Sequence, residues 1–275
     1  MEKTNNISNL YKLKKNELLQ LISKFTKVDD KLLNLLEKNS NDNTVITYIK
    51  NKNSDYETIG YSDEISNYVA LKRTYMILNF IKYSNHKKIY ITKYLDIGCF
   101  NGEKTIEIGK KLNLKPENIH GIDVKSFAGV DIIALDNFKF HTYEKDYHLP
   151  FEDNTFDFIT LIQVLHHIKE QEQILNEIKR VLKPRGLLFI REHDKNDELD
   201  DKLIKLEHLL YSQIADKTEY DVYIKDNYEK YFSRSDLENK LKILGFNILT
   251  QSIDLNYKKT NPTKYYNMMV QLYKL

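Results

Sequence analysis

The stretch Tyr94-Leu-Asp-Ile-Gly-Cys-Phe-Asn-Gly-Glu-Lys-Thr105 decides the fold of this chain. Its apolar start predicts a buried strand, and Ile106, Ile108 and Leu112 then follow at helical spacing. Two glycines at the strand-to-helix turn let the backbone approach a ligand closely, at the carboxyl edge where doubly wound sheets bind ligands. The spacing Gly-x-x-x-Gly differs from the Gly-x-Gly-x-x-Gly pattern that seats a dinucleotide pyrophosphate. We therefore predict a ligand without that phosphate group.

Short apolar runs alternate with amphipathic segments from residue 91 onward, which is typical of βαβ units around a parallel sheet. Helices are predicted over residues 170–182, 200–215 and 234–244. The predicted strands are Ile91–Ile97, Asn118–Asp123, Lys139–Tyr143, Phe156–Leu161, Leu187–Glu192, Ile248–Ile253 and Tyr266–Tyr273. We predict an α/β fold with a Rossmann-like, doubly wound, mostly parallel sheet, an antiparallel C-terminal strand pair and a helical N-terminal extension.

Residues 8–38 carry apolar side chains at helical spacing and predict a pair of helices, followed by a polar loop at residues 39–43. We divide the chain into a helical N-terminal extension, residues 1–60, and an α/β domain, residues 61–275. The extension is expected to cap the cleft or to bind a protein partner. Lys12, Lys14 and Lys15 are expected on a solvated helix face, with contact to nucleic acid as the alternative.

Composition restricts the class of protein. With 41% hydrophobic and 30% charged residues, the 275-residue chain resembles ordinary globular proteins. It has no apolar run of about 18 residues and no basic-then-apolar leader, so we expect a cytoplasmic protein without a membrane partner. A net charge of +2 gives no overall attraction to nucleic acid. The single cysteine, Cys99, excludes an intrachain disulfide and a multi-cysteine zinc site.

The glycine turn resembles motif I of the class I S-adenosylmethionine (SAM) dependent methyltransferases, which reads roughly Leu-Asp-x-Gly-Cys-Gly-x-Gly. Asp96, Gly98 and Gly102 match that motif, and Cys99 occupies its cysteine position. The resemblance implies that these four residues bind the cofactor SAM, and it makes residues 61–275 a SAM-dependent methyltransferase domain. The middle glycine of the motif is replaced by Phe100.

Acidic residues after the next two strands continue the resemblance. Asp123 ends the second predicted strand about 20 residues beyond the glycine turn, where a carboxylate accepts hydrogen bonds from ribose hydroxyls. The stretch from Asp146 to Asp157 resembles the family segment whose first Asp contacts the adenine amino group and whose next residue offers a backbone donor to the ring. These positions are Asp146 and Tyr147 here, with Glu144 as the competitor of Asp146.

Val164-Leu-His-His-Ile168 closely matches a segment that the same family carries after its fourth strand. Gln163, with Ile162, is expected to line the cofactor cleft. His166 and His167 invite a metal interpretation, but adjacent histidines point in different directions and the sequence offers no third ligand at suitable spacing. We expect no metal.

Substrate-side chemistry is predicted at Arg191-Glu-His-Asp194, directly after an apolar strand. Glu192 and His193 are the candidate catalytic residues, because a histidine titrates near neutral pH and suits a general base. A salt-bridged turn is the alternative. His208 and Tyr211 either close over the same cleft or pack, and packing is favoured.

The sequence thus predicts a SAM-dependent methyltransferase that acts on an oxygen or nitrogen nucleophile of a small molecule or an RNA. N-methylation of adenine or glutamine is disfavoured, because the Asn/Asp-Pro-Pro-Tyr/Phe tetrapeptide is absent after the fourth strand. Carbon-5 methylation of cytosine by a cysteine nucleophile is disfavoured, because the only thiol lies within motif I. The alternative is a catalytically inactive SAM-fold subunit that binds a partner. The glycine spacing disfavours a nucleotide-dependent oxidoreductase, which is a third interpretation.

Overall fold

The computed structural model describes residues 7–38, 40–53, 74–79, 81–82, 90–124, 138–143, 147–214, 228–253 and 267–275. The chain divides into two compact units. The helical unit comprises residues 1–60, 193–233 and 254–268, and the sheet unit comprises residues 61–192, 234–253 and 269–275. The predicted extension, residues 1–60, therefore shares a unit with later segments of the chain, and the predicted domain division stays a prediction.

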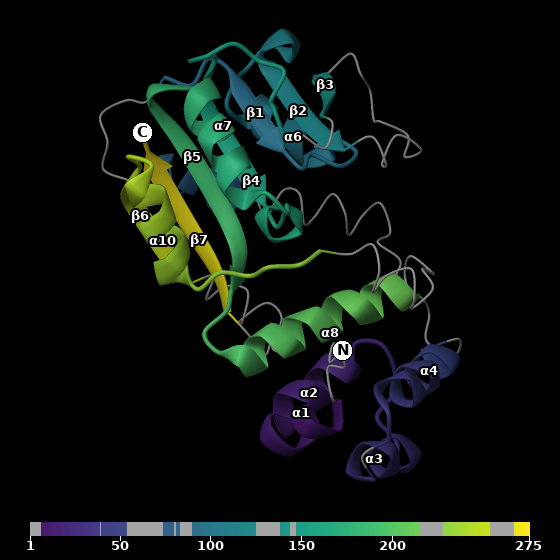
Figure 1. Cartoon of the computed structure of the whole chain (residues 1–275). Helices are drawn as coiled ribbons and strands as arrows, with labels where there is room; N and C mark the ends of the chain where they lie inside the picture. Colours follow the sequence, from purple (N-terminus) through teal and green to yellow (C-terminus); the bar gives the residue numbers. More distant parts are fainter. Residues whose placement is uncertain are drawn as a thin grey trace. The chain divides into compact units, whose positions relative to one another are not determined.

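One seven-stranded sheet, with strand order β3-β2-β1-β4-β5-β7-β6, forms the frame of the sheet unit (Figure 1). Neighbours from β3 through β5 pair in parallel, and β6 pairs with β7 antiparallel. The strands are β1 Tyr94–Ile97, β2 Ile119–Val124, β3 Lys139–Tyr143, β4 Phe156–Ile162, β5 Leu182–Asp194, β6 Asn247–Ile253 and β7 Asn267–Lys274. This arrangement confirms the predicted fold class, and its order reverses direction between β1 and β4, where ligands bind in open α/β sheets.

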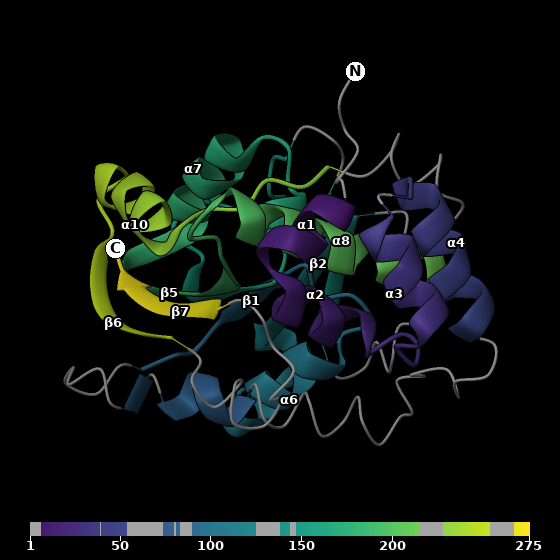
Figure 2. The same cartoon turned by 90° about the horizontal axis from the view of Figure 1, so that it is seen from below.

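Helices cover both faces of this sheet. They are α6 Glu103–Lys111, α7 Gln171–Val181 and α10 Arg234–Ile243, with the 3-10 helices η2 Pro116–Asn118 and η5 Leu165–His167. Figure 2 shows α7 and α10 on one face and α6 on the other. All four residues of β1 are buried, as expected for a central parallel strand packed on both sides.

The strand β5 differs most from its prediction. It begins at Leu182 rather than at residue 187, because the chain passes directly from α7 into extended backbone. The predicted breaker, residues 183–186, lies within the strand, and the pairing with β4 shifts register between Phe156 and Phe158. Arg185 adopts a left-handed φ of +68° there. A Pro-Gly segment that predicts a turn is accommodated here as an irregularity.

The described residues of the helical unit form four N-terminal helices and one later helix. They are α1 Ile7–Leu13, α2 Lys15–Ile22, α3 Asp30–Glu37, α4 Asp42–Lys52 and α8 Glu198–Ile214. The predicted helical pair over residues 8–38 is wrong, because that range forms three helices. Asn41, within the predicted loop, caps α4 by accepting the Thr44 N–H at 2.8 Å. None of the helices among the described residues has the length and apolar composition to cross a membrane.

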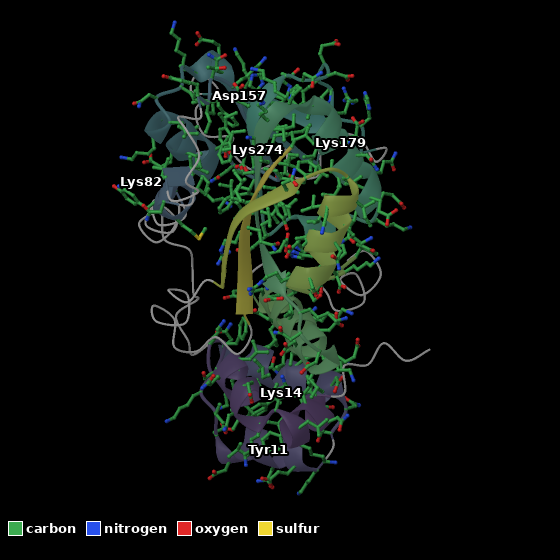
Figure 3. The ribbon with its side chains drawn as sticks, turned by 90° about the vertical axis from the view of Figure 1, so that its left-hand side faces the viewer. Tyr11, Lys14, Lys82, Asp157, Lys179 and Lys274 are labelled. Atoms are coloured by element: carbon green, nitrogen blue, oxygen red, sulfur yellow. The ribbon has the colours of Figure 1, made fainter. Side chains whose placement is uncertain are left out.

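Apolar packing and ion pairs join the N-terminal helices to α8. Leucine and isoleucine side chains of α1, α2, α3, α4 and α8 form one buried cluster. The Lys24 ammonium lies 2.8 Å from the Glu207 carboxylate, and both side chains are at least 90% buried. Lys14, labelled in Figure 3, pairs with Asp200 at 3.0 Å. Lys14, one of the lysines considered for nucleic-acid contact, is therefore engaged inside the helical unit.

Two histidines, one on β2 and one on the neighbouring strand β3, stack on each other. The rings of His120 and His141 have centroids 5.3 Å apart, and His120 Nδ1 lies 3.1 Å from His141 Nε2. Phe151 and Phe156 pack edge-on against His120. Burial, with the charge of Lys93 as a smaller cause, lowers the pKa of His120 to about 4.

We expect this pair to make the protein acid-sensitive. A histidine whose folded pKa lies below its unfolded value of about 6.5 contributes its full stability above pH 6.5 and loses it as the pH falls toward 4. From pH 7.5 to pH 5 the free energy of unfolding should fall by about 2 kcal/mol through His120 alone. Urea unfolding of the wild type and of His120→Gln at both pH values measures this difference. An equal pH dependence in the two proteins would contradict the assignment.

Candidate active site

The turn after β1 carries three left-handed residues. Gly98, Phe100 and Gly102 have φ angles of +75°, +50° and +85°. The N–H groups of Gly98 and Cys99 both donate to Ile122 O, at 2.9 and 3.3 Å, which ties the turn to β2. Side chains are rarely tolerated in this backbone conformation, so the turn needs glycine at its ends.

Steric crowding also requires a glycine at position 98. A Cβ atom built on Gly98 would collide with both methyl groups of Val164. Val164 lies two residues beyond the end of β4, so the turns after β1 and β4 approach each other closely at this edge of the sheet. The structure thus brings the predicted glycine turn and the predicted Val-Leu-His-His segment together.

Two predicted cofactor residues that are not glycine, Tyr147 and Gln163, are also left-handed, with φ angles of +54° and +58°. Gln163 is held in this conformation by Arg191, whose carbonyl oxygen accepts the Gln163 N–H at 2.8 Å and whose guanidinium donates to Gln163 Oε1 at 2.8 Å. Such conformations are unfavourable and gather at ligand-binding sites. Their coincidence with the predicted cofactor residues supports a binding site here.

Asp96 lies inside the sheet rather than at its surface. Its carboxylate accepts hydrogen bonds from Thr105 Oγ1 at 2.7 Å and Thr160 Oγ1 at 2.6 Å, and the residue is only 2% exposed. Burial raises the pKa of Asp96. These contacts join β1, α6 and β4 beneath the glycine turn. They support a role in shaping the turn, and the predicted cofactor contact of Asp96 stays a prediction.

The carboxylate of Asp123 lies next to the glycine turn. Its Oδ2 accepts the Phe100 N–H at 2.7 Å and its Oδ1 accepts the Val124 N–H at 2.8 Å. Burial raises the pKa of the Asp123 carboxyl, and the two N–H donors oppose that shift. An ionised carboxylate has about four lone-pair positions. Two are used by these N–H groups, which leaves two for the vicinal hydroxyls of a ribose. The donor chemistry of this residue therefore fits the adenosine part of SAM.

Cys99 and Asp146 complete the predicted cofactor set. Cys99 is fully buried, and burial raises the pKa of its thiol far above the ordinary value. A buried, neutral thiol is a poor nucleophile, and the predicted cofactor contact of Cys99 stays a prediction. Asp146 and its competitor Glu144 lie outside the described residues.

Glu192 fastens the turn that follows β4. One carboxylate oxygen accepts the N–H groups of Val164 at 2.9 Å and Leu165 at 2.7 Å, and the other accepts His166 Nδ1–H at 2.6 Å. Burial alone would raise the pKa of Glu192, but His166 and the two N–H donors hold it below its ordinary value. These contacts support a positioning role, and the predicted direct catalytic role of Glu192 stays a prediction.

His193, the next residue of β5, belongs to a cluster in the helical unit. Its Nε2 lies 3.3 Å from His208 Nε2, and His208 in turn contacts Tyr231 and Glu229. The sequence analysis missed Tyr231 and Glu229, because no motif or periodic pattern surrounds them. Tyr211 packs edge-on against Phe25 with ring centroids 5.0 Å apart, which confirms packing as its role.

Known proteins resemble this chain over most of its length. A family model described as a methyltransferase domain matches residues 20–251. The demethylmenaquinone methyltransferase of Staphylococcus haemolyticus is 25% identical over 252 residues, which cover 84% of this chain and 100% of that protein. The sterol 24-C-methyltransferase of Schizosaccharomyces pombe is 33% identical over 104 residues, which cover 38% of this chain and only 25% of that protein.

Solved structures share the fold. The putative methyltransferase in complex with the Haloferax volcanii Trm112 methyltransferase activator superposes with a TM-score of 0.54 at 12% identity, covering 79% of this chain and 98% of that one. The sheet order, the motif I turn and the family match over residues 20–251 agree with one another. The chain belongs to the methyltransferase domain family and is a class I SAM-dependent methyltransferase.

Proposed function

We propose that the protein binds SAM at the edge formed by the turns after β1, β2 and β4 and transfers its methyl group to an oxygen or nitrogen nucleophile of a small molecule. The observation that carries this proposal is the left-handed turn at Gly98–Gly102 with the Asp123 carboxylate bound to its Phe100 N–H. The relation to an enzyme named for demethylmenaquinone supports a small-molecule acceptor. Of the three lysines considered for nucleic-acid contact, Lys14 is engaged within the protein by its ion pair with Asp200 of α8.

Seven of the predicted residues are assigned a part in this reaction. SAM supplies an electrophilic methyl group on a sulfonium. Gly98 and Gly102 let the backbone approach the cofactor, Asp123 accepts its ribose hydroxyls, and Tyr147 and Gln163 present backbone groups from strained conformations. Glu192 fixes the turn after β4, and His193 accepts a proton. Transfer of this kind needs mainly positioning and, for protonated nucleophiles, a base.

A protein partner on the N-terminal helices is a separate proposal. The buried faces of α1, α2, α3 and α4 are used against α8 and one another. A partner would therefore meet their outer, polar faces. The archaeal relative's complex with an activator is a property of that protein, and it motivates a co-purification experiment for this one.

Asp123→Ala is expected to weaken SAM binding at least about 30-fold, because it removes hydrogen bonds from two hydroxyls to a charged acceptor. Calorimetric titration with SAM and with S-adenosylhomocysteine measures the dissociation constants. The matched control is Asp153→Asn, since the Asp153 side chain is 69% exposed and pairs with Arg180 at the surface. Its dissociation constants should equal those of the wild type.

Two results would contradict the proposal. Wild-type protein that binds neither compound has no cofactor site of this kind, and unchanged affinity in Asp123→Ala would remove Asp123 from it. Binding without label transfer from methyl-labelled SAM to any component of metabolite and RNA extracts would favour the alternative of an inactive partner-binding subunit.

A further inference from the structure

An arginine and a glutamate near the C-terminus of α7 form a bidentate ion pair inside the sheet unit. Glu177 Oε1 accepts Arg180 Nε–H at 2.9 Å, and Glu177 Oε2 accepts Arg180 Nη2–H at 2.7 Å. The guanidinium of Arg180 holds the pKa of Glu177 below its ordinary value. Only 25% of the Arg180 side chain and 15% of the Glu177 side chain are exposed. The Glu177 carboxylate is therefore ionised at neutral pH and acts only as an acceptor.

The guanidinium of Arg180 uses all five of its N–H donors, three of them outside the pair with Glu177. Nη1 donates to Phe151 O at 2.7 Å and to Asp153 Oδ1 at 2.8 Å, and Nη2 donates to Leu149 O at 2.9 Å. The five donors of a guanidinium lie in one rigid plane, so they fix two carbonyl groups of the segment before β4 relative to α7. Asp153, whose side chain is 69% exposed, is the outermost contact, and the two backbone contacts do not involve it.

Leu149 is held on both sides of its α-carbon. Its N–H donates to Glu177 Oε2 at 3.0 Å, and its carbonyl oxygen accepts from Arg180. The preceding residue, His148, places its Nδ1 2.9 Å from the same carboxylate oxygen. The Leu149 side chain is fully buried. Displacement of Leu149 would therefore break hydrogen bonds to two charged groups, which are stronger than bonds between neutral groups.

The rest of the segment is fixed from the other side by the sheet. The ring of Phe151 packs edge-on against His141 and Phe156, with centroid distances of 4.7 and 4.8 Å. Further along, Asn154 N–H donates to Arg180 O at 2.9 Å, and the next N–H group donates to the carbonyl oxygen of Val181. The segment from Leu149 to the start of β4 thus has a defined position in the sheet unit.

Tyr147, the residue proposed to present its backbone to the cofactor, lies two residues before Leu149. Its φ of +54° is left-handed. A conformation of this kind persists only where the surrounding structure fixes it. Because two residues of chain span at most about 7 Å, the anchoring of Leu149 restricts where the backbone of Tyr147 can lie.

We infer that Arg180 and Glu177 are positioning residues of the cofactor site, which hold the backbone of Tyr147 for the adenine ring and make the site selective for adenine over hypoxanthine. This inference rests on the proposed function. A backbone N–H that faces N1 of adenine meets a lone pair, whereas N1 of hypoxanthine carries a proton. Hypoxanthine also has a carbonyl in place of the amino group. A site built to hydrogen-bond a group strongly rejects an analogue that lacks it, provided that the partners are held in place.

Titration with two cofactor analogues tests the selectivity. S-adenosylhomocysteine carries adenine, and S-inosylhomocysteine carries hypoxanthine at the same place. Calorimetry should show that the wild type binds the first at least about 30-fold more tightly. In Arg180→Lys this ratio should fall below about 5, because lysine keeps the charge but lacks the planar fork of donors. An unfolded fraction lowers both affinities by the same factor, so the ratio reports the geometry of the site and not the stability of the protein.

Glu177→Gln provides a second, milder change. The carboxamide keeps an oxygen for the Leu149 N–H but loses the bidentate ion pair, so the ratio should fall about 3-fold to 10-fold. The matched controls are Glu172→Gln and Arg185→Lys. Glu172 lies on the same helix, is 81% exposed and pairs with Lys240, and Arg185 is exposed on β5. Both controls should keep the wild-type ratio.

Hydrogen exchange of the Leu149 amide tests the anchoring without a ligand. Exchange should be at least about 10-fold faster in Arg180→Lys and Glu177→Gln than in the wild type. Unchanged exchange in both variants would show that the pair does not hold the segment. Faster exchange with an unchanged ratio of dissociation constants would overturn the positioning role.

The wild type alone separates this inference from the proposed function. If it binds neither analogue, the proposed cofactor site is wrong and the selectivity falls with it. If it binds both equally tightly, the cofactor site stands and the inferred selectivity for adenine is wrong.

Discussion

Gly98→Ala is expected to abolish measurable SAM binding and to destabilise the protein by about 2–4 kcal/mol. Two costs add at this position. The φ of +75° is unfavourable for alanine, and the new Cβ would collide with the side chain of Val164. Relief of the collision requires the turns after β1 and β4 to separate, which displaces the backbone proposed to hold the cofactor. Calorimetric titration with SAM and urea unfolding measure the two effects.

The variant Gly245→Ala separates the cost of backbone strain from the cost of a steric collision. Gly245 has a φ of +94°, but a Cβ there meets no atom within 4 Å. This variant should lose about 1 kcal/mol of stability and bind SAM like the wild type. If Gly98→Ala and Gly245→Ala lose the same stability and both retain SAM affinity, the close approach of the two turns is not required for binding.

The sheet follows from the sequence because its pattern is local. Four of the five parallel strands begin and end within three residues of their predictions, since their apolar runs are buried on both faces. The fifth, β5, starts five residues early, because Leu182 already pairs with Phe156; the register with β4 then passes over residues 183–186, where Pro184 and Gly186 lie, and resumes at Leu187. The number of N-terminal helices was wrong for a related reason. Apolar spacing continues from α1 into α2, and the break between them lies at Lys14, whose φ of −134° and ψ of 50° are not helical and which makes no side-chain cap hydrogen bond.

The candidate site is only partly readable from the sequence. Asp123 and the glycine turn come together as predicted, because motif spacing in a parallel sheet fixes which strand ends are neighbours. The contacts of Glu192 with the turn after β4, and of His193 with Glu229 and Tyr231 through His208, depend on packing between segments distant in sequence. No local pattern records such contacts.

Glu192→Ala is expected to lower the free energy of unfolding by about 3–5 kcal/mol, among the largest effects of any single substitution in the sheet unit. The change leaves the N–H groups of Val164 and Leu165 and the Nδ1–H of His166 without their carboxylate acceptor. Each buried donor that loses its partner costs about 1–3 kcal/mol. Urea unfolding at pH 7.5 measures the loss.

Glu192→Gln and Glu172→Ala complete this experiment. Glutamine keeps an oxygen for the two N–H groups and should cost only about 1–2 kcal/mol. Glu172, whose side chain is 81% exposed, pairs with Lys240 at the surface, and Glu172→Ala should cost under about 0.5 kcal/mol. Because the folded pKa of Glu192 lies below its ordinary value, its contribution is complete above about pH 4.5 and is lost as the pH falls through the folded pKa. If Glu192→Ala is as stable as Glu172→Ala but has lost turnover, Glu192 acts on the substrate directly instead of holding the turn after β4.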